Sequence, residues 1–175
     1  MAAAVQTDAD LVAGRSCGSC TLCCKVMGIR ELDKPRLTWC GHCDKKRGCM
    51  IYETRPETCR EFYCAWMTTA ELGDHWKPLN ARMVLTHDRT RNWLIVHPDS
   101  GRPDAWLEEP YLSDLRAWSV YMTPKGGRVM VFRGDRVIAV LPNGEQDLGP
   151  LLRDAATEMA RRRSDDGDTA VPASS

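Results

Sequence analysis

The sequence predicts an α+β protein in two parts, a cysteine-rich, largely helical and loop module followed by a small antiparallel β layer with flanking helices. The first observation is that all nine cysteines lie between residues 17 and 64, so they belong to one local site. The second is that apolar runs typical of strands begin only after residue 80. A chain of 175 residues has the length of one ordinary domain, or of a domain with a small module attached.

Composition divides the chain into four segments. Residues 1–14 are predicted to be a flexible arm, residues 15–72 the cysteine-cluster module, and residues 73–163 an α+β part packed on it. Residues 164–175 read SDDGDTAVPASS and have little apolar surface to bury, so they are predicted to be a disordered tail.

A helix is predicted to begin near Arg55 within the cysteine-rich module. Thr54 and Glu57 have the spacing of a capping box, and Pro56 is tolerated in a first helical turn. This helix would carry Cys59 and Cys64, which would point about 140° apart at 3.6 residues per turn. One ion could therefore take both thiols only if the helix ended or distorted between them.

Apolar runs and turn formers predict the elements of the second half. Residues 82–87 and 92–97 read as two strands, and residues 110–122 as a helix bracketed by prolines. Residues 129–132 and 137–141 form a predicted hairpin that turns at Gly134 and Asp135. Residues 151–163 read as a terminal helix. We find no catalytic motif in this half, which leaves open whether the protein is an enzyme.

Charge and hydropathy disfavour several classes of partner. The net charge is zero and the pI is near 7, so there is no overall electrostatic reason to bind nucleic acid or an acidic membrane. No apolar run approaches the roughly 20 residues that span a bilayer. The first 14 residues lack the features of a signal peptide, which predicts a cytoplasmic protein with reduced thiols. No protein partner can be named from the sequence.

The stretch CGSCTLCC brings four of the cysteines within eight positions. Short CxxC turns in a reducing compartment favour metal ligation or redox chemistry, because two thiolates can face one ion without a long loop. Cys17, Cys20 and Cys23 have the CxxCxxC spacing of a bacterial ferredoxin run, but Cys24 follows at once, so the match is partial. Adjacent side chains point in different directions, and Cys23 and Cys24 are therefore expected to serve two ions or two faces of one cluster.

Basic residues are concentrated in the same part of the chain. Residues 15–60 contain ten basic residues against five acidic ones, a net charge of +5. A divalent ion held by four thiolates carries a net charge of about −2, which neighbouring cations stabilise. The excess of basic residues approximately matches the charge of two such sites.

The full cysteine pattern, together with C-x-I-Y-x-x-R-P-x-x-C-R-x-F from Cys49 to Phe62, resembles the YkgJ-type CxxCxxCC cysteine-cluster family, whose members are described as zinc- or iron-chelating domains. The resemblance covers roughly residues 15–66. It implies metal binding by eight thiols, at Cys17, Cys20, Cys23, Cys24, Cys40, Cys49, Cys59 and Cys64. Cys43 departs from the pattern and is either a spare thiol or a substitute ligand. His42 is an alternative ligand or an exposed side chain.

Three functions remain open at this point. The cluster could hold zinc, structurally or as a carrier. It could instead hold iron, as an iron–sulfur cluster for electron transfer or sensing. The third reading is a thiol-redox enzyme with a nucleophilic cysteine, although the strand-then-helix setting of a thioredoxin-like fold is missing. In the metal-binding readings, Trp39 and Trp66 are expected to shield the site from water.

Overall fold

The computed structural model of the protein describes residues 11–151. The predicted terminal helix from residue 151 and the predicted tail lie almost entirely outside this range. The arm predicted over residues 1–14 is described from Leu11 onward. There, the backbone N–H of Val12 donates to the carbonyl of Met67 at 2.9 Å, so this part of the arm contacts the body of the protein.

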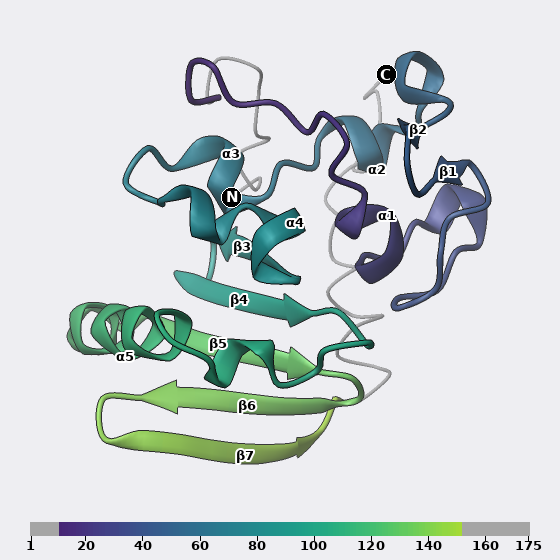
Figure 1. The fold of residues 1–175 in the computed structure, drawn as a ribbon. Helices are drawn as coiled ribbons and strands as arrows, with labels where there is room; N and C mark the ends of the chain where they lie inside the picture. The colour runs from purple at the N-terminus through teal and green to yellow at the C-terminus, as the bar shows by residue number, and fades with distance from the viewer. Residues whose placement is uncertain (1–10, 152–175) are drawn as a thin grey trace, which may run out of the picture.

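A five-stranded sheet forms the second half of the chain, and its strands follow the order of the sequence (Figure 1). The strands are β3 (Met83–Asp88), β4 (Trp93–Pro98), β5 (Arg128–Arg133), β6 (Arg136–Leu141) and β7 (Gly144–Pro150). A separate two-stranded sheet, β1 (Cys43–Asp44) with β2 (Gly48–Cys49), lies in the cysteine-rich part. The α+β fold class predicted from sequence is therefore confirmed.

The pairing of the large sheet differs from the prediction in one respect. Three of its four strand pairs are antiparallel, but β4 and β5 run parallel, with Ile95 opposite Met130. A parallel pair needs a crossover connection. That connection contains helix α5 (Tyr111–Met122), so the helix predicted between the two hairpins is the reason that the layer is mixed rather than antiparallel.

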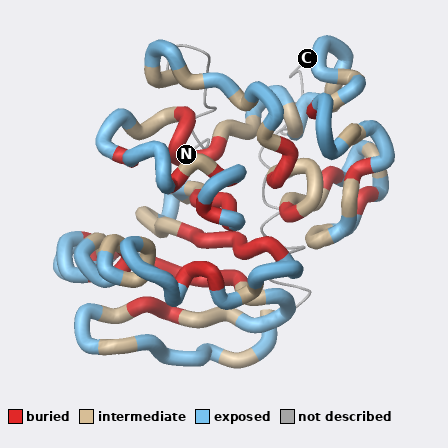
Figure 2. The backbone as a smooth tube through the Cα atoms, in the orientation of Figure 1, coloured by how far each residue is buried: buried red, intermediate tan, exposed pale blue. Residues whose placement is uncertain are grey.

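Alternation along the strands gives the sheet two apolar faces. On β5, Val129 and Val131 belong to the main core, which α5 covers with Leu115 and Met122. Met130 and Phe132 alternate with those valines and belong to a smaller core on the opposite face. Figure 2 shows the buried backbone concentrated in the central strands, whereas β7 is largely exposed. The period of two in the apolar pattern therefore buries both faces of the central strands.

The remaining helices are all short: α1 (Leu22–Val26), α2 (Glu57–Arg60), α3 (Ala65–Thr68) and α4 (Pro78–Ala81). The α1, α3 and α4 helices contact β3, so the cysteine-rich part sits at the β3 edge of the sheet (Figure 1). Leu22, Val26 and Cys64 are buried in the same main core as the strands. One hydrophobic core thus joins the two parts of the chain.

The helix predicted to carry both Cys59 and Cys64 is instead two helices. α2 begins at Glu57 with Pro56 at the N-cap, and Thr54 makes no capping bond there, so the predicted capping box is wrong. Cys59 lies in α2, whereas Cys64 is the extended N-cap residue of α3. The chain therefore breaks between the two thiols and frees them from helical geometry.

Asp99, just after β4, links the two parts electrostatically. Its carboxylate is 3 % exposed and accepts hydrogen bonds from Lys25 of α1 and, at 3.0 Å, from Arg82. The backbone N–H of Gly101 donates to it as well, at 3.0 Å. Burial raises the pKa of Asp99, but these partners together outweigh that effect and hold the pKa below its usual value. A buried carboxylate with these partners stays ionised and ties α1 to the end of β4.

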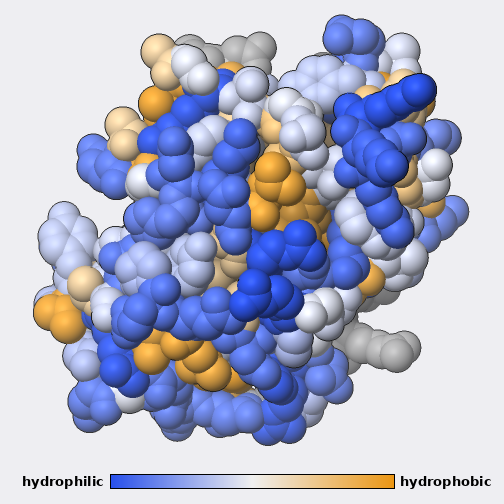
Figure 3. All heavy atoms as spheres, viewed as in Figure 1, coloured by the Kyte–Doolittle hydropathy of each residue, from blue (hydrophilic) through white to orange (hydrophobic). Residues whose placement is uncertain are grey.

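Figure 3 shows that one face of the molecule is mostly hydrophilic, with hydrophobic side chains reaching the surface in small groups. A search of the described helices finds none with the length and apolar character that a membrane crossing would require.

The buried histidine of the sheet, His97 on β4, is enclosed by the smaller core. Its Nε2 atom is hydrogen-bonded to the hydroxyl of Thr86 at 3.1 Å, and its ring packs edge-on against Phe132 with centroids 5.4 Å apart. Its Nδ1 atom has no hydrogen-bond partner in residues 11–151. Burial, together with the nearby charge of Arg36, lowers the pKa of His97 to about 3. The imidazole is therefore neutral in the folded protein.

We expect this histidine to make the fold sensitive to acid. The unfolded chain binds a proton at His97 with a pKa of 6.5, whereas the folded chain does not until about pH 3. Stability from this residue is therefore lost as the pH falls below 6.5, by about 2 to 3 kcal/mol between pH 7 and pH 4.5. Urea unfolding at a series of pH values should show this slope in the wild type and a smaller one in His97→Gln. Equal slopes in the two proteins would contradict the assignment.

Candidate metal centre

The first thiols are held by a tight turn and an arginine anchor. The backbone N–H of Cys20 donates to the carbonyl of Cys17 at 2.8 Å, and Gly18 adopts a φ of 51° within this turn. Arg15 precedes the turn, and its guanidinium reaches the chain that follows Cys64. It donates to the carbonyls of Trp66, Thr69, Ala70 and Leu72. The anchor fixes the Cys17 turn beside the start of α3.

Helix α1 turns the next two cysteines away from the core. Leu22 and Val26 are four residues apart, share one face and are buried. Cys23 and Cys24 lie on the rest of the helix and are half-buried. Cys23 raises the pKa of Cys24, so the two thiols are neighbours. The expectation that they serve two ions or two faces of one cluster stays a prediction.

Backbone hydrogen bonds bring a second stretch of chain to Cys24. The N–H of Cys40 donates to the carbonyl of Cys24 at 3.0 Å, and the N–H of Cys43 donates to the carbonyl of Cys40 at 3.1 Å. Cys43 then pairs directly with Cys49 across β1 and β2. Cys24 and Cys43 also shift each other's pKa, so their thiols are neighbours. Three separate segments of sequence thus meet around Cys24.

Gly48 on β2 allows the backbone there to approach the backbone of the Cys17–Cys20 turn. It has a φ of 102°, and a Cβ atom there would lie 3.4 Å from the carbonyl oxygen of Gly18. Strand β2 therefore packs against the Cys17–Cys20 turn. Glycine suits this position because a positive φ strains residues that carry a side chain. It also has no Cβ atom that would press against the carbonyl oxygen of Gly18.

The nine thiols divide into two adjoining groups and one residue between them. The core thiols, Cys17, Cys20 and Cys64, pack into the main hydrophobic core. The outer thiols are five residues that interact with one another: Cys24, Cys40, Cys43, Cys49 and Cys59. Cys23 lies next to the outer thiols because it neighbours Cys24. The groups adjoin, because the charge of Cys24 also acts on Cys17.

Burial and crowding favour the protonated form of two of the core thiols, Cys17 and Cys64. Burial raises the pKa of Cys64 to about 11, and the charges of Cys17 and Cys20 add to this effect. The pKa of Cys17 is raised in the same way, by burial first and then by Cys20. Each of these thiols therefore resists ionising while its neighbours are near and no cation is bound.

Three of the outer thiols, Cys24, Cys43 and Cys59, also have a raised pKa. The hydrogen bond from Cys23, together with burial, raises the pKa of Cys24 above its ordinary value. Burial and the neighbouring thiols raise the pKa of Cys43 to about 12 and that of Cys59 to about 11. For Cys59 those neighbours are Cys24, Cys49 and Cys40, which places the α2 thiol with the thiols of the earlier segments.

Basic side chains accompany both groups. Lys34 is buried and donates to the carbonyls of Lys25, Met27 and Pro35. Burial lowers the pKa of Lys34, whereas the charges of Cys40, Cys24, Cys23 and Cys59 act to raise it, so its ammonium lies near the outer thiols. Arg55 and Lys77 act on Cys17 and lower its pKa in opposition to burial. The excess positive charge of this segment is thus partly directed at the thiols.

The two tryptophans expected to shield the site differ in burial. Trp66 is 6 % exposed, and Arg15 and Lys77 lie over its ring at 4.9 and 5.0 Å. Trp39 is only half-buried, with Lys45 and Lys25 over its ring at 5.0 and 5.8 Å. The thiol-bearing residues next to them are both buried, Cys40 at 8 % and Cys64 at 9 % exposed, so the difference between the tryptophans does not expose Cys40.

All nine cysteines are free thiols, with none joined in a disulfide. Zinc and iron sites need this donor type, and four thiolates complete a tetrahedral shell. The thiols lie near one another but do not form a finished metal site. In residues 11–151, no three Cys, His, Asp or Glu side chains are placed so that they could hold a metal ion. The residues fit a thiophilic metal in chemistry and number, and binding would require the side chains to turn inward.

A pocket opens beside the outer thiols. It has a volume of about 320 Å³ and is lined by Lys34, Thr38, Trp39, Cys40 and His42, among others. His42 itself is exposed, and its carbonyl accepts a hydrogen bond from the N–H of Met50 at 2.8 Å. Cys40 contributes to the pocket lining but is itself buried, at 8 % exposed.

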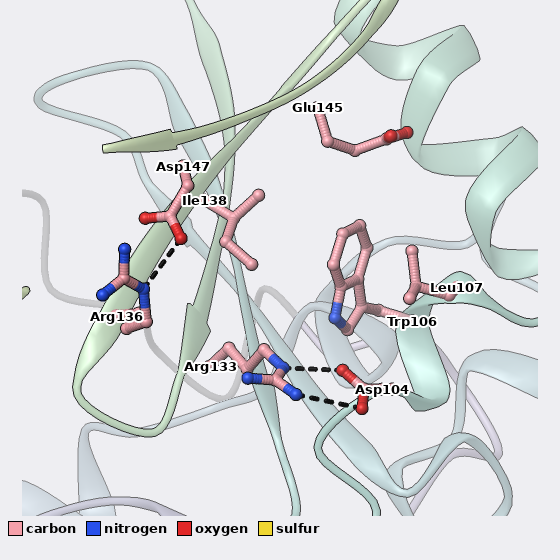
Figure 4. Close-up of a pocket in the computed structure, with 8 residues that line it drawn as sticks. All are labelled: Asp104, Trp106, Leu107, Arg133, Arg136, Ile138, Glu145 and Asp147. Carbon is pink, nitrogen blue, oxygen red and sulfur yellow. Dashed lines mark hydrogen bonds and ion pairs between the residues drawn. The ribbon is translucent and has the colours of Figure 1, made fainter. Parts of the chain in front are cut away.

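A second pocket, of about 310 Å³, lies over the sheet, beside Trp106 and the β5–β6 hairpin (Figure 4). Its charged groups are paired with one another, Arg133 with Asp104 at 2.6 and 3.1 Å and Arg136 with Asp147 at 2.7 Å. Its other carboxylate, Glu145, accepts from Arg116 at 2.7 Å. The charges in this pocket are paired, and the residues that line it include no nucleophile. The thiol cluster is therefore the better functional candidate.

Sequence reasoning identified most of the residues that the structure gathers. Seven of the eight predicted ligands fall in the two groups, and Cys23 adjoins them through Cys24. It left Cys43 out of the eight ligands, although Cys43 pairs with Cys49 across β1 and β2 and its thiol neighbours Cys24. The run CDKKRGC, with a polar turn between two cysteines, is a signal that could have identified this hairpin. Lys34 and Arg15 carry no such signal, because nothing local distinguishes them from surface cations.

Comparison of the chain with models of known protein families, with curated proteins and with solved structures finds no match. The resemblance to the YkgJ-type family therefore stays a prediction, and the case for a metal centre depends on the thiols themselves.

We expect Lys34→Met to destabilise the protein by about 2 to 3 kcal/mol, because a buried ammonium bound to backbone carbonyls is lost and those carbonyls are left without a donor. Urea unfolding of the metal-free, reduced protein measures the change. Lys46→Met is the matched control, since Lys46 is exposed. Similar stability of the two variants would show that the Lys34 contacts do not hold the module.

Proposed function

We propose that this protein binds zinc or iron through its cysteine thiolates. The observation that carries the proposal is the assembly of nine uncrosslinked thiols, from segments up to 47 residues apart, into two adjoining groups of three and five with Cys23 beside them. Buried free cysteines ordinarily behave as small hydrophobic residues. Nine of them within electrostatic reach of one another, with basic side chains directed at them, are instead the donor set of a soft metal ion.

The protonation of the thiols supports this function in a specific way. Burial, and then repulsion between neighbouring thiolates, raises the pKa of Cys43, Cys59 and Cys64 in the metal-free protein. A bound cation attracts the thiolates and so favours their ionised form. Metal binding therefore releases protons from the thiols. Lys34, Arg55 and Lys77 offset the negative charge that the thiolates leave after the metal is counted. When bound, zinc would supply folding energy, and iron would supply electron transfer.

An iron–sulfur protein is the alternative within the same proposal, since all-sulfur ligation suits both metals. A thiol-redox enzyme is less well supported. A nucleophilic cysteine needs a lowered pKa and a cationic, accessible setting. The resolved shifts at Cys17, Cys24, Cys43, Cys59 and Cys64 are all upward.

We expect the protein, purified without oxygen, to contain about two metal ions per chain, since eight thiolates at four per ion make two tetrahedral shells. Elemental analysis and the visible spectrum measure this. A colourless protein with zinc supports a zinc centre, and a brown one with iron and sulfide supports the cluster. A protein that retains its fold without metal and takes up neither zinc nor iron would contradict the proposal.

We expect Cys20→Ser and Cys59→Ser to lose at least half of the bound metal, because serine cannot replace a thiolate toward zinc or iron. The measurement is metal content per chain after purification without oxygen. Ser19→Ala changes an exposed neighbour in the same turn and should retain the full content. Full metal content in both cysteine variants would show that these thiols are not ligands.

A further inference from the structure

We propose that Cys43 and Cys49 are an oxidation site of this protein, at which an anionic small-molecule disulfide such as oxidised glutathione forms a cross-strand disulfide. The two residues face each other across the hairpin of β1 and β2 (Figure 1). This inference goes beyond the proposed metal binding and does not depend on it. It gives a role to Cys43, which the family resemblance leaves without a ligand position.

The first argument is the backbone geometry of the pair. Cys43 and Cys49 are directly opposite each other on antiparallel strands. Just outside the pair, the N–H of Met50 donates to the carbonyl of His42 at 2.8 Å. A bond at that position identifies the cysteines as a non-hydrogen-bonded pair, in which Cα atoms lie about 4.5 Å apart and side chains approach most closely. A disulfide needs Cα atoms about 4.4 to 6.8 Å apart, so the backbone already meets this requirement.

The turn between the strands holds this geometry before any bond forms. The Asp44 carboxylate accepts hydrogen bonds from the N–H groups of Lys46 and Arg47, at 2.8 and 2.9 Å. Gly48 completes the hairpin with a φ of 102°, which residues with a side chain rarely adopt. Disulfide formation therefore requires rotation of two side chains but no rearrangement of the backbone.

Two other pairs of cysteines are close in sequence and less well placed. Cys23 and Cys24 are adjacent, and Cα atoms across a trans peptide are about 3.8 Å apart, which is too short for a disulfide. Cys17 and Cys20 flank a tight turn and lie outside the strands of residues 11–151, so no strand pairing holds their side chains opposite each other. The hairpin pair is therefore expected to oxidise first.

The second argument is the charge of the turn. Lys45, Lys46 and Arg47 are consecutive, exposed and directly between the two cysteines. Against them stands one acidic residue, Asp44, so the turn has a net charge of +2. Oxidised glutathione has more carboxylates than ammonium groups and is anionic at neutral pH. Clustered cations raise the local concentration of such an anion, an effect that salt screens.

The reaction consists of two thiol–disulfide exchanges. The Cys49 thiolate attacks one sulfur of the oxidant and releases a thiolate, which leaves Cys49 in a mixed disulfide. Cys43 then attacks the Cys49 sulfur and releases the second thiolate. Two electrons pass to the oxidant, and the two released thiolates take up the protons that the protein thiols lose. Burial and neighbouring thiols raise the pKa of Cys43 to about 12, so we expect a modification over minutes to hours rather than rapid turnover.

The test is oxidation of the full-length, reduced protein by oxidised glutathione, with a chelator present to exclude metal. Iodoacetamide blocks the free thiols at intervals, and tandem mass spectrometry of tryptic peptides locates the disulfides. Trypsin cuts at the basic residues of the turn, so this disulfide joins two separate peptides. We expect the Cys43–Cys49 bond to form first. A first disulfide elsewhere, such as Cys17–Cys20, or no disulfide at all, would overturn the proposal.

A serine variant tests the order of the two exchanges. In Cys43→Ser, oxidation should stop with one glutathionyl group on Cys49, because the second thiol is missing. Cys23→Ser is the matched control, since it removes a thiol outside the pair and should still form the hairpin disulfide. If Cys49 in the Cys43→Ser protein joins another cysteine as fast as it joins Cys43 in the wild type, the hairpin does not direct the reaction.

The charge of the turn is tested with a double variant, Lys45→Gln with Lys46→Gln. Oxidised glutathione at low salt should oxidise it at least about threefold more slowly than the wild type. The uncharged hydroxyethyl disulfide should oxidise both proteins at the same rate. Equal effects with the two oxidants would refute the selection of an anion. Because metal is excluded throughout, a chain that binds neither zinc nor iron defeats the proposed function alone.

Discussion

The cysteine-rich module depends on the sheet because it has almost no regular backbone structure of its own. Its helices are four or five residues long and its strands two, lengths at which local hydrogen bonding contributes little stability. What holds the module is the core that Leu22, Val26 and Cys64 share with the strands, the buried carboxylate of Asp99, and the clasps made by Arg15 and Lys34. The thiols converge because these few anchors bring three stretches of chain to one place.

The same anchors explain why the positive charge matters here although the protein as a whole is neutral. Two of the three cations near the thiols lie at fixed positions. Lys34 is held by carbonyls, and Lys77 lies over the ring of Trp66. A charge held in a partly buried position is screened less by salt than one on a mobile side chain. The module therefore keeps positive charge at fixed positions beside the thiols, where it partly offsets the burial that raises their pKa.

Local patterns predicted the strands and the long helix well, because period-two alternation and proline brackets are properties of a few neighbouring residues. The parallel pairing of β4 with β5 was not predictable in that way, since it depends on how a 29-residue connection crosses the sheet. Strand β7 was not predicted because its sequence, GEQDLGP, is polar and has no apolar alternation. The eight predicted ligands came from the family resemblance of the cysteine pattern. The division of the thiols into two groups depends on the break between α2 and α3, which no proline or glycine between Arg60 and Ala65 signals.

The order of the strands places the two ends of the sheet in different circumstances. The β3 edge is occupied by the thiol-bearing module, while β7 forms the other edge, and Leu148 on it is 51 % exposed. Ion pairing between Arg136 and Asp147 and the glycines at either end of β7 make that edge a poor template for uncontrolled strand addition. A fluorophore or an immobilising surface attached along β7 would therefore sit four strands away from the sulfur atoms, leaving them free to react.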